Sequence, residues 1–320
     1  MFEDLQQSLQ ALHDRYRCLN EGSVAAYIPE LSKADPDGYC VAITLVDGTQ
    51  YIVGDQDTQF TLQSVSKPLV FGQALTTAGR NIVTALTGVE PTGGSFSAFE
   101  DLDDEGCPLN PMVNAGAIVT ASLIPGNTHE DRTKVINDMV AKYTGAQPTL
   151  DQAVMDSELR TGDRNRALGY LLKDKGYIEG SVTDALNLYF HQCSLKVNTQ
   201  QLANAAATLA NHGVNPVTQQ RAVSTTYVKD ILVVMLMSGM YNYAGRWAYE
   251  IGIPAKSGVS GAIFGVIPGV MGIGVYSPRL DEYSNSTRGI ETFRDLTKQY
   301  NLHFLGPDLQ TTDHIIDPNT

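Results

Sequence analysis

The chemistry suggested by this sequence begins with a serine and a lysine three positions apart, Ser64 and Lys67 in the segment FTLQSVSKP. Pro68 lacks a backbone N–H and is tolerated only in the first turn of a helix, so it predicts a helix that begins near Ser64. The partial positive charge of the helix N-terminus would lower the pKa of Lys67, and a neutral lysine can take the proton of a serine. The pair is therefore a candidate nucleophile and base. The alternative is a helix-capping serine followed by a solvated lysine.

A second segment, PAKSGVSG at residues 254–261, contains Lys256, Ser257 and Gly258 in sequence. A Lys-Ser/Thr-Gly element on an edge strand accompanies Ser-x-x-Lys in one group of serine enzymes. The backbone N–H groups of Val259 and Ser64 could then bind a developing oxyanion. Taken alone, the segment is more typical of a turn between strands, and it is the combination with Ser64 and Lys67 that favours the nucleophile.

The N-terminal part of the chain predicts a helix followed by a β-hairpin. Apolar side chains recur there every three or four residues, as on one face of an amphipathic helix. They are Phe2, Leu5, Leu9, Leu12 and Tyr16. Two β-rich runs then flank Asp47–Gly48, which is a strong hairpin-turn signal.

The order of the predicted elements indicates an α+β fold. A largely helical block at 64–224 separates the hairpin from a β-rich stretch after Trp247, and a final helix is predicted near 287–301. Both β parts can join one antiparallel sheet only if the helical block is an insertion. We therefore expect one domain of two subdomains, an α/β part (1–63 and 225–305) with helices covering its sheet and an all-helical part (64–224). A cleft between them is the expected site, and 306–320 is expected to be a loose tail.

Composition excludes several classes of function. The net charge of −13 argues against a nucleic-acid partner, because phosphate binding needs a basic face. No apolar run is long enough to span a membrane, and the N-terminus lacks the pattern of a signal peptide, so a cytoplasmic protein is expected. The four cysteines are far apart and are expected to be reduced and buried, and the histidines show no paired metal-ligand spacing.

Several longer segments carry a resemblance to a known family. They are AAYIPEL (25–31), LQSVSKPL (62–69), NPMVNAGAI (110–118), SELRTGDRN (157–165), AATLANHG (206–213), GMYNYAGRWA (239–248) and IPAKSGV (253–259). In this order, across about residues 20–290, they resemble the serine-dependent glutaminases of the compact bacterial type. The resemblance implies a β-lactamase/transpeptidase-like fold and hydrolysis of L-glutamine to L-glutamate and ammonia. It implies no metal and no organic cofactor.

The resemblance also implies catalytic roles for three residues. Ser64 would be the nucleophile that attacks the side-chain amide, and Lys67 its proton acceptor. Tyr241 would relay a proton to the leaving ammonia, for which a phenol beside a lysine could have a lowered pKa. The alternative for Tyr241 is a half-buried structural tyrosine.

Substrate-binding roles follow from the same resemblance. Glu158 would bind the ammonium group, although a solvated surface glutamate is the alternative. Asn165 would bind the carboxylate near a helix N-terminus, where free N–H groups favour an anion, although simple capping is equally plausible. The remaining implied pocket residues are Tyr27, Gln63, Asn114, Tyr189 and, through its backbone N–H, Val259; for Asn114 and Tyr189 the alternative is packing within the core.

Two other functions stay open. One is a Ser-x-x-Lys esterase or penicillin-interacting hydrolase, and the lack of an export signal argues against a cell-wall peptidase but not against an esterase. The other is a non-catalytic amino-acid-binding sensor, against which the intact Ser64, Lys67 and Lys256 argue. A homodimer or homotetramer is expected, because such enzymes are commonly oligomeric.

Overall fold

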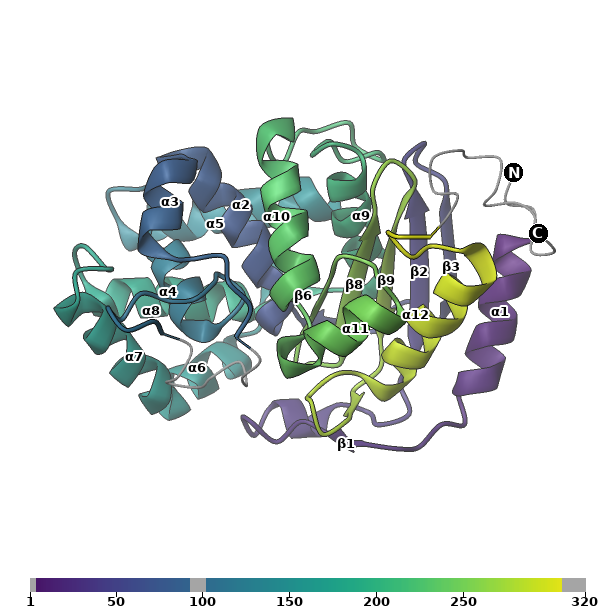
Figure 1. Ribbon diagram of the computed structural model, residues 1–320. Coiled ribbons are helices and arrows are strands. Elements are labelled where there is room, and N and C mark those ends of the chain that lie inside the picture. The colour runs from purple at the N-terminus through teal and green to yellow at the C-terminus, as the bar shows by residue number, and fades with distance from the viewer. Residues whose placement is uncertain (1–3, 93–101, 307–320) are drawn as a thin grey trace.

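A five-stranded antiparallel sheet forms one half of the molecule, in a computed structural model that describes residues 4–92 and 102–306 (Figure 1). Its strand order is β3-β2-β9-β8-β7. The strands are β2 (Cys40–Leu45), β3 (Gln50–Gly54), β7 (Ala255–Ser257), β8 (Ala262–Ile267) and β9 (Met271–Tyr276). The hairpin predicted at Asp47–Gly48 joins β2 to β3, and Gly48 takes a left-handed φ of 91° that suits glycine. The prediction that both β-rich parts share one antiparallel sheet is confirmed.

Helices cover both faces of this sheet. The helices α1 (Leu5–Tyr16), α11 (Ala244–Glu250) and α12 (Thr287–Tyr300) pack on one face through an apolar cluster that includes Leu9, Trp247 and Phe293. The other face carries α9 (Thr199–Ala210), whose small alanines approach the backbone of β9. A Cβ added to Gly272 would lie 2.0 Å from the backbone nitrogen of Ala207, so glycine permits this close contact.

The second half of the molecule is mainly helical (Figure 1). Its helices are α2 (Lys67–Ala78), α3 (Arg80–Leu86), α4 (Asn114–Ser122), α5 (His129–Thr144), α6 (Gln152–Thr161), α7 (Asp163–Asp174) and α8 (Val182–Cys193). Residues Asn114–Ala121 of α4 are all buried, and this helix contacts α2, α7 and α8. The helix α10 (Thr225–Ser238) contacts both α2 and β7, so it lies between the two halves.

The range 64–224 differs from the purely helical subdomain that was expected. The helix α9 belongs to the sheet half, because its alanine-rich surface fits against the glycines of β9. A small sheet of order β4-β6-β5 also draws two strands from this range, and consists of β4 (Phe60–Thr61), β5 (Thr149–Leu150) and β6 (Leu195–Val197). Helical periodicity predicts a helix but not the surface against which it packs.

Short elements complete the described chain. The strands β1 (Ser23–Val24) and β10 (Arg279–Leu280) pair with each other. Residues 4–92 and 102–306 also contain three 3-10 turns, η1 (Leu31–Lys33), η2 (Gln63–Ser66) and η4 (Tyr241–Tyr243). Phe2 of the predicted first helix, the segment 93–101 and the tail from 307 lie outside the described residues.

A fully buried arginine ties several of the connecting segments together. The guanidinium of Arg288 on α12 donates hydrogen bonds to the carbonyl oxygens of Leu19 (2.9 Å), Arg17 (3.0 Å) and Asp37 (3.1 Å). Such bonds satisfy both the buried cation and the carbonyl groups of irregular backbone. Arg288 thus anchors the chain on both sides of the segment that contains Tyr27.

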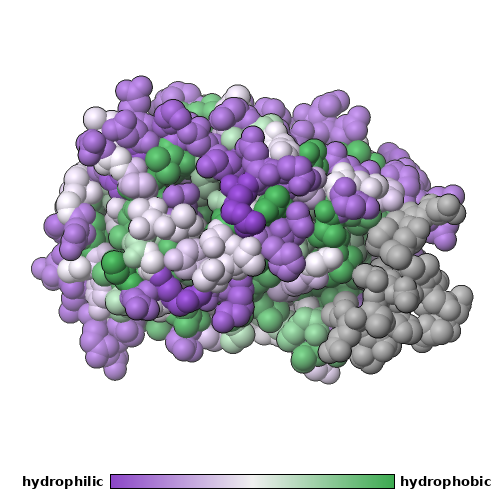
Figure 2. Space-filling model, turned by 90° about the horizontal axis from the view of Figure 1, so that it is seen from above, coloured by the Kyte–Doolittle hydropathy of each residue, from purple (hydrophilic) through white to green (hydrophobic). Residues whose placement is uncertain are grey.

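The molecular surface mixes polar and apolar side chains. Figure 2 shows a face on which hydrophilic side chains predominate, with apolar ones interspersed. All four cysteines are free, but Cys18 is exposed and Cys107 only partly buried, so the expectation of four buried thiols is wrong for these two. In residues 4–92 and 102–306, no helix has the length and apolar character needed to cross a membrane.

Candidate active site

Ser64 lies in the turn η2, which runs directly into α2 at Lys67. The backbone of Lys67 is helical even though proline follows it, with Pro68 inside the first turn of α2 as predicted. Ser64 is buried and the side chain of Lys67 is fully buried, so the alternative of a solvated lysine is wrong. Gln63 has a left-handed φ of 47°, a costly conformation for a non-glycine residue that here precedes the candidate nucleophile.

The amino group of Lys67 is held by two acceptors. Its Nζ donates hydrogen bonds to the Asn114 side-chain oxygen (2.7 Å) and to the carbonyl oxygen of Met112 (3.0 Å). The same Asn114 oxygen accepts a hydrogen bond from the Tyr189 hydroxyl (3.0 Å), and the Asn114 amide nitrogen donates to the Asn165 side-chain oxygen (3.0 Å). One asparagine therefore connects α2, α7 and α8 around the lysine.

The edge strand β7 brings the second motif to the candidate nucleophile. A Cβ added to Gly258 would lie 3.2 Å from the carbonyl oxygen of Leu62, and glycine therefore lets the end of β7 come close to η2. Two backbone hydrogen bonds fix the turn that follows, from Gly258 N–H to Ala262 (2.9 Å) and from Gly261 N–H to Gly258 (2.9 Å). Val259 lies within this turn and is buried.

Tyr241 approaches Ser64 from the segment between α10 and α11. Its phenol is hydrogen-bonded to the Ser64 side chain and donates to the carbonyl oxygen of Ser257 (3.0 Å). Burial raises the pKa of Tyr241 above its usual range, so the expected lowering is not found. Removing the phenolate from water disfavours the charged form more than the two hydrogen bonds favour it. At neutral pH Tyr241 is a neutral phenol.

Glu158 on α6 is buried rather than solvated, with 3 % of its surface exposed. Burial raises its pKa to about 7, while a hydrogen bond with Gln63 and the charge of Lys67 act in the opposite direction. A carboxylate in such a place is stabilised by any cation that enters beside it. Tyr27 lies close to Glu158 and is hydrogen-bonded to the side chain of Asn165.

These contacts bring the predicted side chains together. Ser64 is hydrogen-bonded to Tyr241, and Lys67 is hydrogen-bonded to Asn114. Gln63 is hydrogen-bonded to Glu158. Asn114 is hydrogen-bonded to Tyr189 and Asn165. Asn165 is in turn hydrogen-bonded to Tyr27. Val259 lies in the turn at the end of β7 next to η2. Their individual roles remain predictions.

Two supporting residues were missed by the sequence reasoning. The Ser66 hydroxyl donates to the carbonyl oxygen of Gln63 (2.7 Å) and accepts a hydrogen bond from the Gln192 side chain (3.2 Å). This pair braces the strained turn η2 from α8. Gln192 follows Tyr189 by three positions and so lies on the same face of the predicted helix. This spacing could have identified Gln192 from the sequence.

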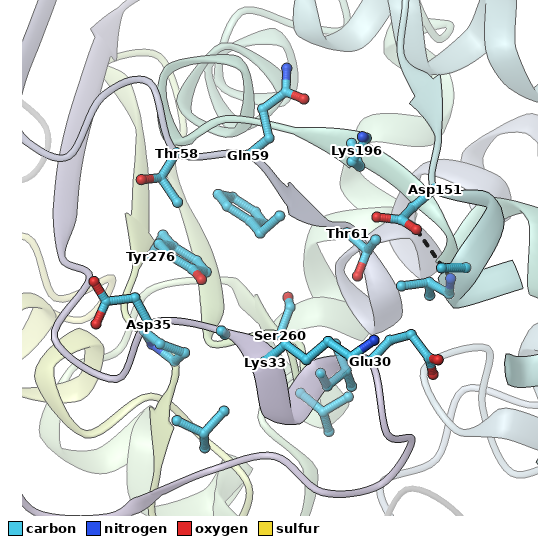
Figure 3. A pocket seen from close by; sticks show the side chains of 18 residues that line it. Glu30, Lys33, Asp35, Thr58, Gln59, Thr61, Asp151, Lys196, Ser260 and Tyr276 are labelled. Atoms are coloured by element: carbon cyan, nitrogen blue, oxygen red, sulfur yellow. Dashed lines mark hydrogen bonds between the residues drawn. The ribbon is translucent and has the colours of Figure 1, made fainter.

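A cavity of about 360 Å³ adjoins the site at Val259 and Ser260 (Figure 3). Its wall includes side chains of β4, β6 and η1, among them Thr61, Lys196 and Lys33, and it does not include Ser64. Val259 belongs to a small apolar cluster with Ile28, Leu31, Val154 and Leu280. This cluster joins the turn that contains Val259 to the segment that contains Tyr27 and to α6. In the described part of the chain, no three His, Cys, Asp or Glu side chains converge as a metal site would require.

The mixed fold, the Ser-x-x-Lys turn at the start of α2 and the Lys-Ser-Gly edge strand define a protein of the β-lactamase-like class. A glutaminase family model matches residues 22–305. The chain therefore belongs to the glutaminase family.

Named relatives support this assignment. A glutaminase of Nostoc sp. is 49% identical over 292 residues, which cover 91% of this chain and 87% of that protein. A solved structure of the probable glutaminase ybaS has a TM-score of 0.92 at 40% identity, covering 94% of this chain and 98% of that one. A probable glutaminase from Bacillus subtilis, complexed with 6-diazo-5-oxo-L-norleucine, has a TM-score of 0.85 at 32% identity, with 93% and 96% covered.

The burial of Glu158 predicts a stability that depends on pH. Because its pKa of about 7 exceeds the ordinary 4.5, the folded chain holds an extra proton between these values, and this group lowers the free energy of unfolding as pH rises through that window. Glu158→Gln is expected to raise the free energy of unfolding at pH 8 by roughly 1–3 kcal/mol, and the gain should fade toward pH 4.5. Urea unfolding of the original chain and of Glu158→Gln at a series of pH values measures this difference in the free energy of unfolding. Exposed Glu282→Gln is the control, and a gain for Glu158→Gln that does not vary with pH would contradict the assignment.

Proposed function

We propose that this chain hydrolyses L-glutamine to L-glutamate and ammonia through a glutamyl ester on Ser64. One observation supports the proposal above the others. The fully buried amino group of Lys67 lies one turn from Ser64 and is fixed by the Asn114 side chain and the Met112 carbonyl. A lysine withdrawn from water in this way is suited to accept a proton from a neighbouring hydroxyl.

Membership of the glutaminase family makes the chain an amidohydrolase that acts on glutamine. A free amino acid carries an ammonium and a carboxylate, and each needs a partner in a buried site. Glu158 supplies a carboxylate for the ammonium. Asn165 lies in the first turn of α7, where N–H groups without helical partners favour the substrate carboxylate. We assign Tyr27, Gln63 and Tyr189 to the same binding site, because they are hydrogen-bonded to Asn165, Glu158 and Asn114 respectively.

The reaction then follows from these positions. Lys67 takes the proton of Ser64 as Oγ attacks the amide carbon of glutamine, and the oxyanion is bound by the N–H groups of Ser64 and Val259. The C–N bond breaks when the leaving nitrogen receives a proton from Tyr241 or Lys67. Because burial keeps the Tyr241 phenol protonated, it is suited to donate rather than to accept at this step. Water then cleaves the ester and releases glutamate.

Replacement of the nucleophile tests the reaction directly. Ser64→Ala is expected to lower ammonia release from L-glutamine by at least about 1,000-fold, while glutamine binding and thermal stability change little. Ammonia is measured with L-glutamine, L-asparagine and D-glutamine. Ser122→Ala, at the far end of α4, is the control and should retain full activity.

Other outcomes distinguish the alternatives. Substantial turnover by Ser64→Ala would remove Ser64 from the nucleophile role. Glutamine binding without ammonia release by the wild-type protein would favour the sensor. Turnover of p-nitrophenyl esters or nitrocefin without turnover of glutamine would favour the esterase or penicillin-interacting hydrolase.

The role of Glu158 predicts how substrate affinity depends on pH. Only the ionised carboxylate attracts an ammonium, and the ionised fraction of a group with a pKa of about 7 falls as pH decreases below that value. The KM for L-glutamine is therefore expected to rise about tenfold per pH unit below 7, since the charges of free glutamine change little between pH 5 and 7. Glu158→Gln should remove this dependence and raise KM at least about 100-fold. A wild-type KM that is constant from pH 5 to 7 would contradict this role.

We also propose that the chain forms a homodimer or homotetramer in the cytoplasm. Val233 and Met237, one turn apart on α10, are 51% and 45% exposed, as apolar side chains at an interface between copies would be. The four free thiols suit a reducing compartment. Light scattering of the purified chain should give a multiple of 34.6 kDa that falls to one copy in Val233→Asp. A monomeric wild type would overturn the assembly, and cell fractionation tests the compartment.

A further inference from the structure

Lys256 in the middle of β7 has a side chain that is fully buried. Its Nζ donates hydrogen bonds to the carbonyl oxygens of Ser257 (2.7 Å) and Gly239 (2.9 Å) and lies 3.9 Å from the centre of the Tyr241 ring. Burial, followed by the charge of Lys67, holds the pKa of Lys256 well below its usual range. The mechanism above gives this buried amine no task.

The two carbonyl groups that Lys256 binds both control the position of Tyr241. Gly239 precedes Tyr241 by two residues, and its carbonyl also accepts the N–H of Ser257 (3.2 Å). Ser257 carries the carbonyl oxygen to which the Tyr241 hydroxyl donates. Lys256 therefore ties the backbone before Tyr241 to the carbonyl that orients its phenol. Tyr241 needs such restraint, because its φ of 56° is unfavourable for a non-glycine residue.

The Ser257 carbonyl oxygen is shared by two donors, the amine of Lys256 and the phenol of Tyr241. When Tyr241 turns its O–H toward the leaving nitrogen, this buried carbonyl loses one donor. A buried acceptor without any partner would raise the energy of that step. With Lys256 still bound, the carbonyl keeps a partner while the phenol is engaged elsewhere.

We propose that Lys256 is a positioning residue that holds Tyr241 at Ser64 and releases its phenol from the Ser257 carbonyl during departure of ammonia. The inference rests on the proposed function. Lys256 itself exchanges no proton. The proton that Ser64 gave to Lys67 replaces the one that Tyr241 passes to the leaving nitrogen, so the phenol is restored when the C–N bond has broken.

A double-mutant cycle tests this role. Lys256→Met removes both hydrogen bonds at similar length and is expected to lower kcat for L-glutamine about 10- to 100-fold, with KM changed less than about threefold. In a Tyr241→Phe background the same substitution should lower kcat by no more than about twofold, because the phenol through which it acts is gone. Equal losses of kcat in both backgrounds would overturn the inference.

Two further variants separate positioning from folding. Lys256→Gln keeps an amide donor and should recover part of the kcat lost in Lys256→Met. If Lys256→Met does not fold, the double-mutant cycle uses Lys256→Gln in its place. Equal losses of kcat in both backgrounds would again overturn the inference. Arg132→Met is the control, because it also removes a largely buried basic side chain that donates to carbonyl groups, here those of Ser122 and Ile124 at the far end of α4. It should lower the melting temperature while leaving kcat per folded molecule unchanged. A fully active Lys256→Met beside an inactive Ser64→Ala would refute this inference alone, whereas an active Ser64→Ala would refute the proposed function.

Discussion

The enclosure of the Lys67 amine is the constraint on which the rest of the site depends. A lysine without solvent contact must find hydrogen-bond acceptors within the protein, and here they include Asn114 and the Met112 carbonyl. Once the Asn114 oxygen faces Lys67, its amide nitrogen faces Asn165. The need to satisfy one buried amine thereby orients groups on three helices and extends to the position that we assign to the substrate carboxylate.

The site forms where the two halves of the molecule meet. The helical half supplies the buried lysine and its acceptors, and the sheet half supplies the end of β7, which glycine allows to approach the turn η2. The segment with Tyr27 is held on one side by the hydrogen bonds of Arg288 and on the other by the small apolar cluster that contains Ile28 and Val259. Residues from seven separate parts of the sequence thus meet at this junction, near positions 27, 63–67, 114, 158–165, 189, 241 and 259.

Several features of the site oppose stability. Gln63 and Tyr241 adopt left-handed backbone conformations, and Glu158 is enclosed although burial disfavours its charge. Such costs persist only where the surrounding structure imposes them, here through Ser66 and Gln192 at η2 and through Lys256 at Tyr241. Conflicts between local preference and the fold are expected at functional sites, and these lie around Ser64.

The sequence by itself determined the local structure and the family of this protein. The Asp47–Gly48 turn, the helix start at Pro68 and the order of β-rich and helical segments depend on near neighbours, and each was predictable. Only the tertiary structure decided that α9 packs on the sheet, that Glu158 is buried, and that burial raises rather than lowers the pKa of Tyr241. It alone also showed that Lys256 and Tyr241 share the Ser257 carbonyl. Burial and hydrogen-bond partners arise from residues far apart in the chain, and the spacing of residues along a sequence contains no measure of either.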